Sequence, residues 1–167
     1  MRRQRTSGSV SALAGGRGPD PRLNAAALPL PNGPNVTLVA ALTSPGLQAA
    51  MTVSGAVNGD VFGRYLEQVP GPTLVAGDVV GLDNLPAHKV AGLAEIVAAH
   101  GARLLYLPPY SPDFNPIELA FSKPKTWLRT AQARTREALE AAIKAAIDWV
   151  SQQDAKNWVD HCRYHVQ

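Results

Sequence analysis

The segment 78–108 constrains the fold most, because two apolar runs flank a helical pattern within it. The runs DVVGL and RLLYL do not alternate apolar with polar residues, as is typical of strands covered on both faces. Between them, the spacing of Val90, Leu93 and Val97 predicts a helix that Gly101 ends. Such a strand-helix-strand unit is a right-handed parallel crossover, so both strands end at one edge of a sheet. The sequence therefore predicts an α/β fold.

The rest of the chain from residue 35 onward adds a hairpin and several helices. The runs NVTLVAAL and LQAAMTVS, separated by the turn sequence SPG, predict an antiparallel hairpin. A helix capped by Asn58 should follow it, a second should begin at Pro116, and two more amphipathic helices should cover 135–150 and the C-terminal end. We interpret 35–167 as one folded domain.

The first 34 residues differ in composition from this domain. They hold ten Gly or Pro and five Arg, with no sustained period of a helix or strand. We therefore expect residues 1–34 to be an irregular, Arg/Gly/Pro-rich segment.

Composition excludes some classes of protein. No apolar run reaches the ~20 residues of a membrane helix, and MRRQRTSGSV is not followed by the apolar stretch of a secretion signal. Cys162 is the single cysteine, so an internal disulfide is excluded, and its plain interpretation is a small, partly buried apolar residue. These features predict a soluble cytoplasmic protein with no membrane partner.

Positive charge is concentrated in one stretch, although the net charge is only +3. Fourteen residues without an acid contain five basic side chains: Lys123, Lys125, Arg129, Arg134 and Arg136. Such a stretch can face the phosphates of DNA. The alternative is an ordinary solvated helix face.

Two carboxylates are expected at the same edge of the sheet. Asp83 ends the first crossover strand, and Glu118 opens the helix after the second strand, with 34 residues between them. Carboxylate oxygens are the ligands that Mg²⁺ prefers, and phosphodiester chemistry uses such ions. The alternatives are structural: Asp83 can hold a turn, while Glu118 can form a capping box with an Asn115 N-cap ahead of Pro116.

Several polar residues fall beside this predicted edge. Asn84 follows Asp83 directly, and His88 can act as a proton shuttle or phosphate contact, or be a surface or capping residue. The same alternatives apply to Lys89, and Asp113 can be a spare ligand or hold an Asx turn. A separate set, Trp127, Trp149 and Trp158, is spaced as core anchors more than as base-stacking residues.

The strings LDNLPAHK and GARLLYLPPYSPDFNPIELAFSKPK resemble the catalytic domain of bacterial insertion-sequence transposases of the mariner superfamily, members of the Asp-Asp-Glu recombinases. The resemblance covers about residues 78–145 and extends more weakly back to residue 36. It implies an RNase-H-like, retroviral-integrase-like mixed sheet with flanking helices, two Mg²⁺ or Mn²⁺ ions, and hydrolysis followed by transesterification at transposon ends. In this resemblance Asp83 is the second acidic ligand and Glu118 the third.

The resemblance also implies partners and a location. The partners are transposon-end and target DNA, with a second copy or a full-length transposase as a further partner, because paired ends are cut together. The location is the bacterial cytoplasm, associated with the nucleoid when on DNA.

The sequence departs from the family's pattern in three respects. The family needs a first aspartate on an earlier strand, but Asp20 lies in the turn-like RGPDPR and Asp60 lies at a helix start. No helix-turn-helix pattern precedes residue 35, and Pro124 interrupts the helix that carries the basic stretch, where a kink is expected. We therefore expect an N-terminally truncated domain that lacks the first strand of the sheet.

Two functional hypotheses follow from the sequence. The first is a transposase fragment that performs metal-dependent DNA cleavage and strand transfer with Asp83 and Glu118. The second is a catalytically inactive remnant that binds only DNA or a transposase subunit. A weaker third hypothesis, another RNase-H-like nuclease, requires an extra acid near the same edge.

Overall fold

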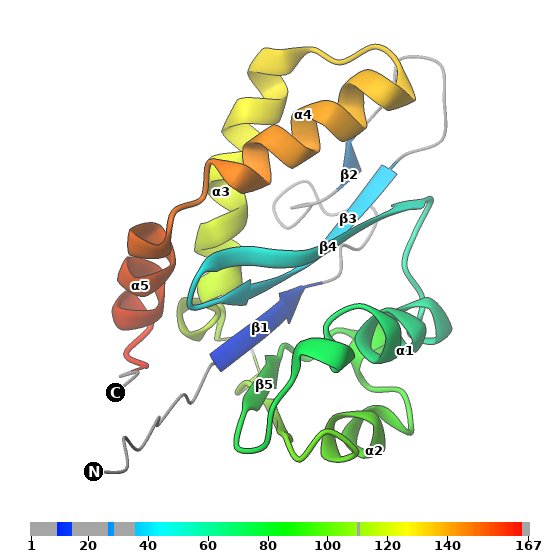
Figure 1. Cartoon of the computed structure of the whole chain (residues 1–167), viewed down its shortest axis with the longest axis vertical. Helices are drawn as coiled ribbons and strands as arrows, with labels where there is room; N and C mark the ends of the chain where they lie inside the picture. The colour runs from blue at the N-terminus through cyan, green and yellow to red at the C-terminus, as the bar shows by residue number, and fades with distance from the viewer. Residues whose placement is uncertain (1–9, 15–26, 29–35, 110, 165–167) are drawn as a thin grey trace, which may run out of the picture.

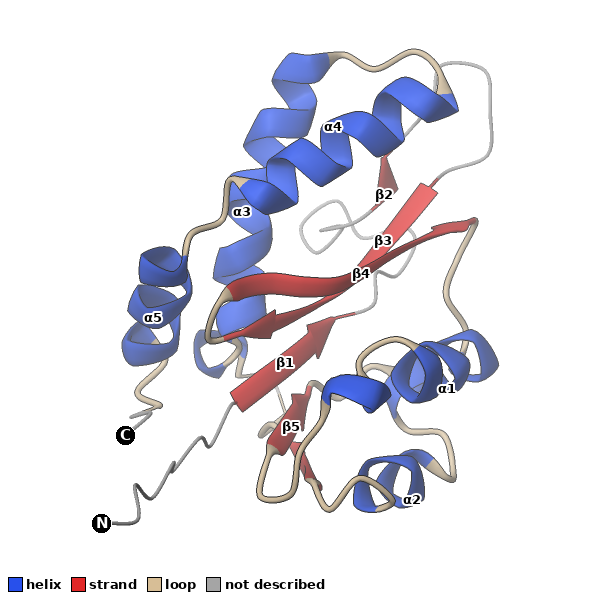
Figure 2. Cartoon of the chain, in the orientation of Figure 1, coloured by secondary structure: helices blue, strands red, loops and turns tan. Residues whose placement is uncertain are grey.

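A mixed sheet with helices on both faces forms the molecule, as a computed structural model shows (Figures 1 and 2). The structure describes residues 10–14, 27–28, 36–109 and 111–164. The strands are β1 (Val10–Ala14), β2 (Ala27–Leu28), β3 (Val36–Thr43), β4 (Gly46–Ser54), β5 (Val79–Leu82) and β6 (Arg103–Tyr106). The α-helices are α1 (Gly59–Gln68), α2 (Leu93–Ala98), α3 (Pro116–Ala131), α4 (Arg136–Asp148) and α5 (Gln152–His161). Among these described helices, none has the length and apolar character needed to cross a membrane.

The sheet combines antiparallel and parallel pairs. β3 pairs antiparallel with β4 along one side and with β1 and β2 along the other. β1 then pairs parallel with β5, and β5 pairs parallel with β6. The spatial order is therefore β4, β3, β1, β5, β6, with β2 continuing the line of β1 beside β3. This order confirms the predicted hairpin and the predicted parallel crossover.

The central strand β1 lies within the segment that the sequence analysis expected to be irregular. The expectation that the sheet lacks its first strand was wrong, because 10–14 pairs with both β3 and β5. A five-residue run gives too short a pattern to show a period. Pairing with two neighbouring strands stabilises β1 although its local sequence does not favour a strand, because strand formation depends strongly on tertiary context.

Two hydrophobic clusters cover the two faces of the sheet. The even-numbered residues of β3 from Val36 to Leu42 pack against α3, α4 and α5, while Val39 and Ala41 pack with α1 and α2. β3 is buried on both faces for this reason, which explains why NVTLVAAL has no polar alternation. Figure 1 shows α3, α4 and α5 on one side of the strands and α1 and α2 on the other.

The crossover between β5 and β6 contains less helix than its apolar spacing predicts. A 3₁₀ turn, η2 (Pro86–His88), precedes α2, and α2 begins only at Leu93. Gly92 has a φ of 94° and separates the two elements, because this backbone conformation is accessible mainly to glycine. His88 consequently lies in the 3₁₀ turn that follows β5 and not on the surface of a helix.

The C-terminal half follows the prediction except at two tryptophans. α3 runs from Pro116 to Ala131 as one continuous helix with Pro124 buried inside it. Trp127 and Trp149 are 40% and 47% exposed and stack on each other with ring centroids 5.5 Å apart, so predicting them as core anchors was wrong. Trp158 does pack against the core.

Candidate active site

Asp83 directly follows β5, at the carboxyl end of the parallel part of the sheet. Its Oδ1 accepts a hydrogen bond from the backbone N–H of Leu85 at 3.1 Å and lies 2.6 Å from Nδ1 of His88. Asp83 therefore does hold a turn, as the structural interpretation predicted, but this role occupies only Oδ1 of its carboxylate. Both of these hydrogen bonds fall on Oδ1, and the side chain is 22% exposed.

His88 is completely buried, so its interpretation as a surface residue was wrong. Its ring lies 4.2 Å, centroid to centroid, from the ring of Phe62 on α1. The Tyr106 hydroxyl, from the end of β6, donates to the His88 carbonyl at 2.6 Å. Contacts from α1 and from the end of β6 thus hold this histidine next to Asp83.

Glu118 lies in the first turn of α3 and is partly buried. Burial raises the pKa of its carboxyl, and the negative charge of Asp83 raises that pKa further. The ammonium of Lys125, seven residues later on the same flank of the helix, acts in the opposite direction. The negative charge of Asp83 therefore acts on Glu118 across the sheet edge, as expected of two carboxylates at the same edge.

The start of α3 is fixed differently from the predicted capping box. Asn115 is the N-cap residue, but its side chain makes no capping hydrogen bond, and within the described part of the chain its buried Oδ1 has no partner. The Glu118 backbone N–H donates to the Asn115 carbonyl at 3.1 Å. The hydroxyl of Tyr164, near the C-terminal end of the chain, donates to the Phe114 carbonyl at 2.8 Å. This contact holds the loop that leads to Glu118. Glu118 is therefore positioned by backbone and loop contacts.

The remaining residues predicted near the site have different surroundings. Asn84 donates from Nδ2 to the Leu107 carbonyl at 2.5 Å and so joins the ends of β5 and β6. Lys89 is exposed at the end of η2. Asp113 is exposed in the 3₁₀ turn η3 (Pro112–Phe114). Burial raises the pKa of the Cys162 thiol, and the negative charge of Asp113 raises it further.

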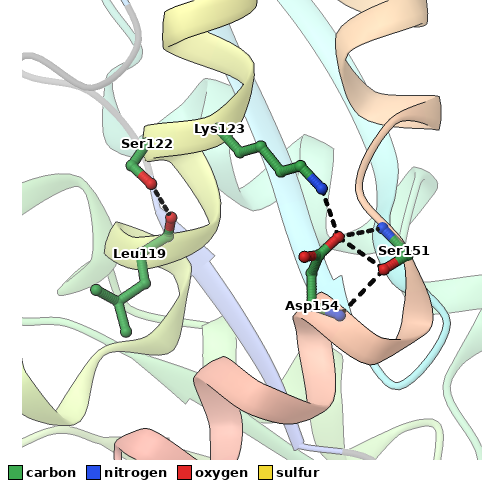
Figure 3. Close-up of polar contacts among 5 residues, drawn as sticks. All are labelled: Leu119, Ser122, Lys123, Ser151 and Asp154. Carbon is green, nitrogen blue, oxygen red and sulfur yellow. Dashed lines mark hydrogen bonds and ion pairs between the residues drawn. The ribbon is translucent and has the colours of Figure 1, made fainter.

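The five basic residues of the predicted DNA-binding stretch do not share one surface. Lys123 donates to Oδ2 of Asp154 at 2.7 Å and lies over the Trp149 ring, as Figure 3 shows for the Asp154 contact. Arg136 contacts Glu140 at 2.6 Å and Ser54 of β4 at 2.9 Å. Arg134 is exposed in the connection between α3 and α4. Only Lys125 and Arg129 share the flank of α3 that carries Glu118.

The position next to Asp83 on the central strand is occupied by alanine. Leu13 of β1 pairs with Leu82 of β5, so the next residue along each chain places Ala14 beside Asp83. Asp20 lies outside the described residues, and Asp60 is exposed in the first turn of α1. Within the described ranges, no group of three His, Cys, Asp or Glu side chains is arranged to hold a metal ion.

The arrangement of Asp83 and Glu118 has the donor chemistry of a divalent-cation site. Two carboxylates in electrostatic contact repel each other when both are ionised, and a bound cation removes that repulsion. Oxygen donors from one or two carboxylates, completed by water and phosphate oxygens, are the usual protein ligands of Mg²⁺. The chemistry of this donor pair suits such an ion.

A mixed sheet in which β1, β5 and β6 run parallel, with helices on both faces, is the arrangement of the RNase-H-like fold. Residues 15–140 match the family model described as DDE superfamily endonuclease. The chain belongs to this family. The match confirms the Asp-Asp-Glu recombinase assignment and begins within the segment before residue 35.

Solved structures support the same fold at low sequence identity. The Mos1 transposase catalytic domain with raltegravir and Mg matches with a TM-score of 0.64 and 12% identity, covering 92% of this chain and 80% of that one. The Mos1 strand transfer complex matches at 0.62 and 14%, covering 93% and 52%. The catalytic core of BIV integrase matches at 0.55 and 13%, covering 93% and 98%.

This chain spans only part of some of these proteins. It covers 46% of the matched chain of a simian T-cell lymphotropic virus intasome, and about half of the Mos1 chain in its strand transfer complex. No curated protein sequence matches it.

Sequence reasoning missed the contacts that hold Asp83. The string LDNLPAHK shows that His88 follows Asp83 by five residues, but it does not show that a 3₁₀ turn folds the ring back onto the carboxylate. Phe62 and Tyr106, which hold His88, lie on distant elements, and their sequence signals are those of ordinary core residues.

Proposed function

We propose that this chain is the catalytic domain of a metal-dependent transposase of the bacterial insertion-sequence type, which cleaves DNA and transfers strands at the ends of its element. The match of residues 15–140 to the DDE superfamily endonuclease family supports this most directly, and the effect of the Asp83 charge on the pKa of Glu118 is consistent with both acids lying at one sheet edge. Family membership and the likeness to Mos1 structures with Mg and Mn support the same chemistry.

Asp83 and Glu118 would hold Mg²⁺ or Mn²⁺, as one ion or as part of a two-ion site. When bound, such an ion activates the attacking water or hydroxyl and stabilises the leaving oxygen of the phosphodiester. Asp83 would present Oδ2, because Oδ1 is already engaged by Leu85 and His88. Lys125 and Arg129, which share the flank of Glu118, would contact the DNA backbone beside the site.

A second copy of the chain, or a full-length transposase, is the proposed protein partner. The likeness to the Mos1 paired end complexes supports this. Target and transposon-end DNA are the proposed substrates.

Nicking of supercoiled plasmid in Mn²⁺ tests the proposal. Asp83→Asn should abolish nicking, since the amide lacks the negative charge that holds the ion. Asp113→Asn is the matched control, because Asp113 is exposed in the loop before α3, and it should nick at the wild-type rate. Wild-type nicking that survives Asp83→Asn would refute the assigned role of Asp83.

The second candidate function is an inactive remnant that binds DNA or a transposase subunit. One observation favours it: Ala14, and not an acid, lies beside Asp83 on the central strand. A site with only two carboxylates should bind the ion weakly.

Ala14→Asp tests whether this position limits the site. A third carboxylate beside Asp83 should raise Mn²⁺ affinity by about tenfold and raise or restore nicking, because ligand charge sets affinity for hard cations. Ala14→Asn adds similar bulk without charge and is the control. Equal Mn²⁺ affinities for the two variants would show that this position does not reach the ion.

A further inference from the structure

His88 has features that a structural core histidine does not need. It is fully buried, yet Nε2 has no hydrogen-bond partner among the residues that the structure describes. Its other ring nitrogen, Nδ1, makes a short contact of 2.6 Å with Oδ1 of Asp83. A buried polar atom without a partner destabilises a fold, so the burial of this ring needs an explanation. The contact of Nδ1 with Asp83 is the candidate.

The surroundings decide which nitrogen carries the proton. Asp83 Oδ1 is an acceptor, so a hydrogen bond at 2.6 Å requires the proton on Nδ1. A proton on Nε2 alone would leave a buried N–H without an acceptor and would place two acceptors in contact at Nδ1. The described contacts therefore favour the Nδ1–H form of the ring.

The ring is held in this orientation from outside the site. The Phe62 ring of α1 lies 4.2 Å from the imidazole, tilted by 42°, and the Tyr106 hydroxyl donates to the His88 carbonyl. Packing and a backbone hydrogen bond thus hold the imidazole independently of its contact with Asp83. The Leu85 N–H, which also bonds to Oδ1, completes this arrangement.

We propose that His88 is a positioning residue for Asp83: its Nδ1–H fixes Oδ1, so that Oδ2 is the oxygen presented toward Glu118 and a shared divalent cation. This inference rests on the proposed function for its cation, but the His88–Asp83 hydrogen bond does not depend on that function. Hydrogen-bond partners that orient a ligating carboxylate are worth about 10–100-fold in metal affinity.

A pair of variants isolates the hydrogen bond from the packing. His88→Asn keeps an N–H donor near the position of Nδ1, while His88→Leu has nearly the same size and shape without a donor. Both lose the ring and its contact with Phe62, so both should lower the melting temperature to a similar degree. In calorimetric titrations with Mn²⁺, His88→Leu should bind about 10–100-fold more weakly than wild type, and His88→Asn should recover most of that loss.

Nitrogen-15 NMR of the metal-free, full-length chain gives an independent readout. The His88 ring should show its proton on Nδ1, and Asp83→Ala should abolish that preference. A proton on Nε2 alone would overturn the proposal, as would equal Mn²⁺ affinities for the Asn and Leu variants. Absence of Mn²⁺ binding by wild type would overturn the metal-positioning role together with the proposed function. The NMR result would then still decide whether His88 holds Asp83.

Discussion

The two flanks of α3 place charged side chains in different surroundings. One flank carries Glu118, Lys125 and Arg129, and the pKa of Glu118 is raised by burial and by the negative charge of Asp83. On the other flank, Lys123 pairs with Asp154 and lies 4.4 Å from the centre of the Trp149 ring. On the first flank, Asp83 opposes the ionisation of Glu118 and Lys125 offsets this only in part, whereas on the second flank Lys123 and Asp154 compensate each other.

Electrostatic strain of this kind separates a candidate site from a structural contact. Asp154 closes a capping box with Ser151 at the start of α5, and hydrogen bonds from Lys123 and Ser151 lower the pKa of Asp154 to about 2. Glu118 shows the opposite shift, because Lys125 only partly offsets burial and Asp83. An acid that is less stable ionised in the folded protein is a candidate for binding a cation that is absent from the chain itself.

The comparison predicts that the two flanks contribute unequally to DNA binding. Replacing both Lys125 and Arg129 by alanine should weaken binding to duplex DNA by about tenfold or more and reduce the dependence of log affinity on log salt by roughly 0.9 for each lost phosphate contact. Replacing both Lys123 and Arg136 by alanine removes the same charge and is the matched control. Because those two side chains are engaged within the protein, their loss should reduce affinity much less.

Fluorescence anisotropy across a series of salt concentrations measures both effects. Equal losses of affinity and equal salt slopes for the two double variants would show that the whole basic stretch forms one surface, contrary to the structure.

Replacing Asp154 and replacing Glu118 should change the stability of the fold in opposite directions. Asp154→Ala should lower the free energy of unfolding by about 1 kcal/mol, because α5 loses the acid that bonds the Ser151 N–H and hydroxyl. Glu118→Gln should raise the melting temperature at neutral pH by a few degrees, since an ionised, partly buried acid near Asp83 is replaced by a neutral amide.

The pH dependence checks the sign of the Glu118 effect. The folded-state pKa of Glu118 lies above its ordinary value of 4.5. The folded protein therefore holds this proton more tightly than the unfolded chain, and stability is lost as the pH rises from that ordinary value through the folded pKa. The stabilisation by Glu118→Gln should accordingly be small near pH 4 and larger near pH 7. A difference that shrinks over this range would contradict the raised pKa.

The sequence predicted the crossover, the hairpin and the positions of Asp83 and Glu118, because each depends on a local pattern. Apolar runs without alternation indicate buried strands, and the Asn115-Pro116 pair marks the start of α3 whatever the side chain of Asn115 does. The 34-residue separation of the two acids was sufficient to place them at one edge once a parallel crossover was inferred.

The sequence did not predict the features that depend on distant contacts. β1 is too short for a periodic signal and forms between two strands, one of which lies more than sixty residues along the chain. The burial of His88 depends on Phe62 and Tyr106, and the exposure of Trp127 and Trp149 depends on how α3 meets the end of α4. Charge counting likewise missed that Lys123 is paired with an acid 31 residues away.

Calorimetric titration with Mn²⁺ tests most directly whether Asp83 and Glu118 act as one cation site. Wild type, Asp83→Asn, Glu118→Gln and the double variant form a cycle. If both carboxylates hold the same ion, each single substitution should weaken binding by about tenfold or more, and the double variant should bind little worse than the weaker single variant. Free-energy losses that simply add, or wild-type affinity in either single variant, would contradict a shared site.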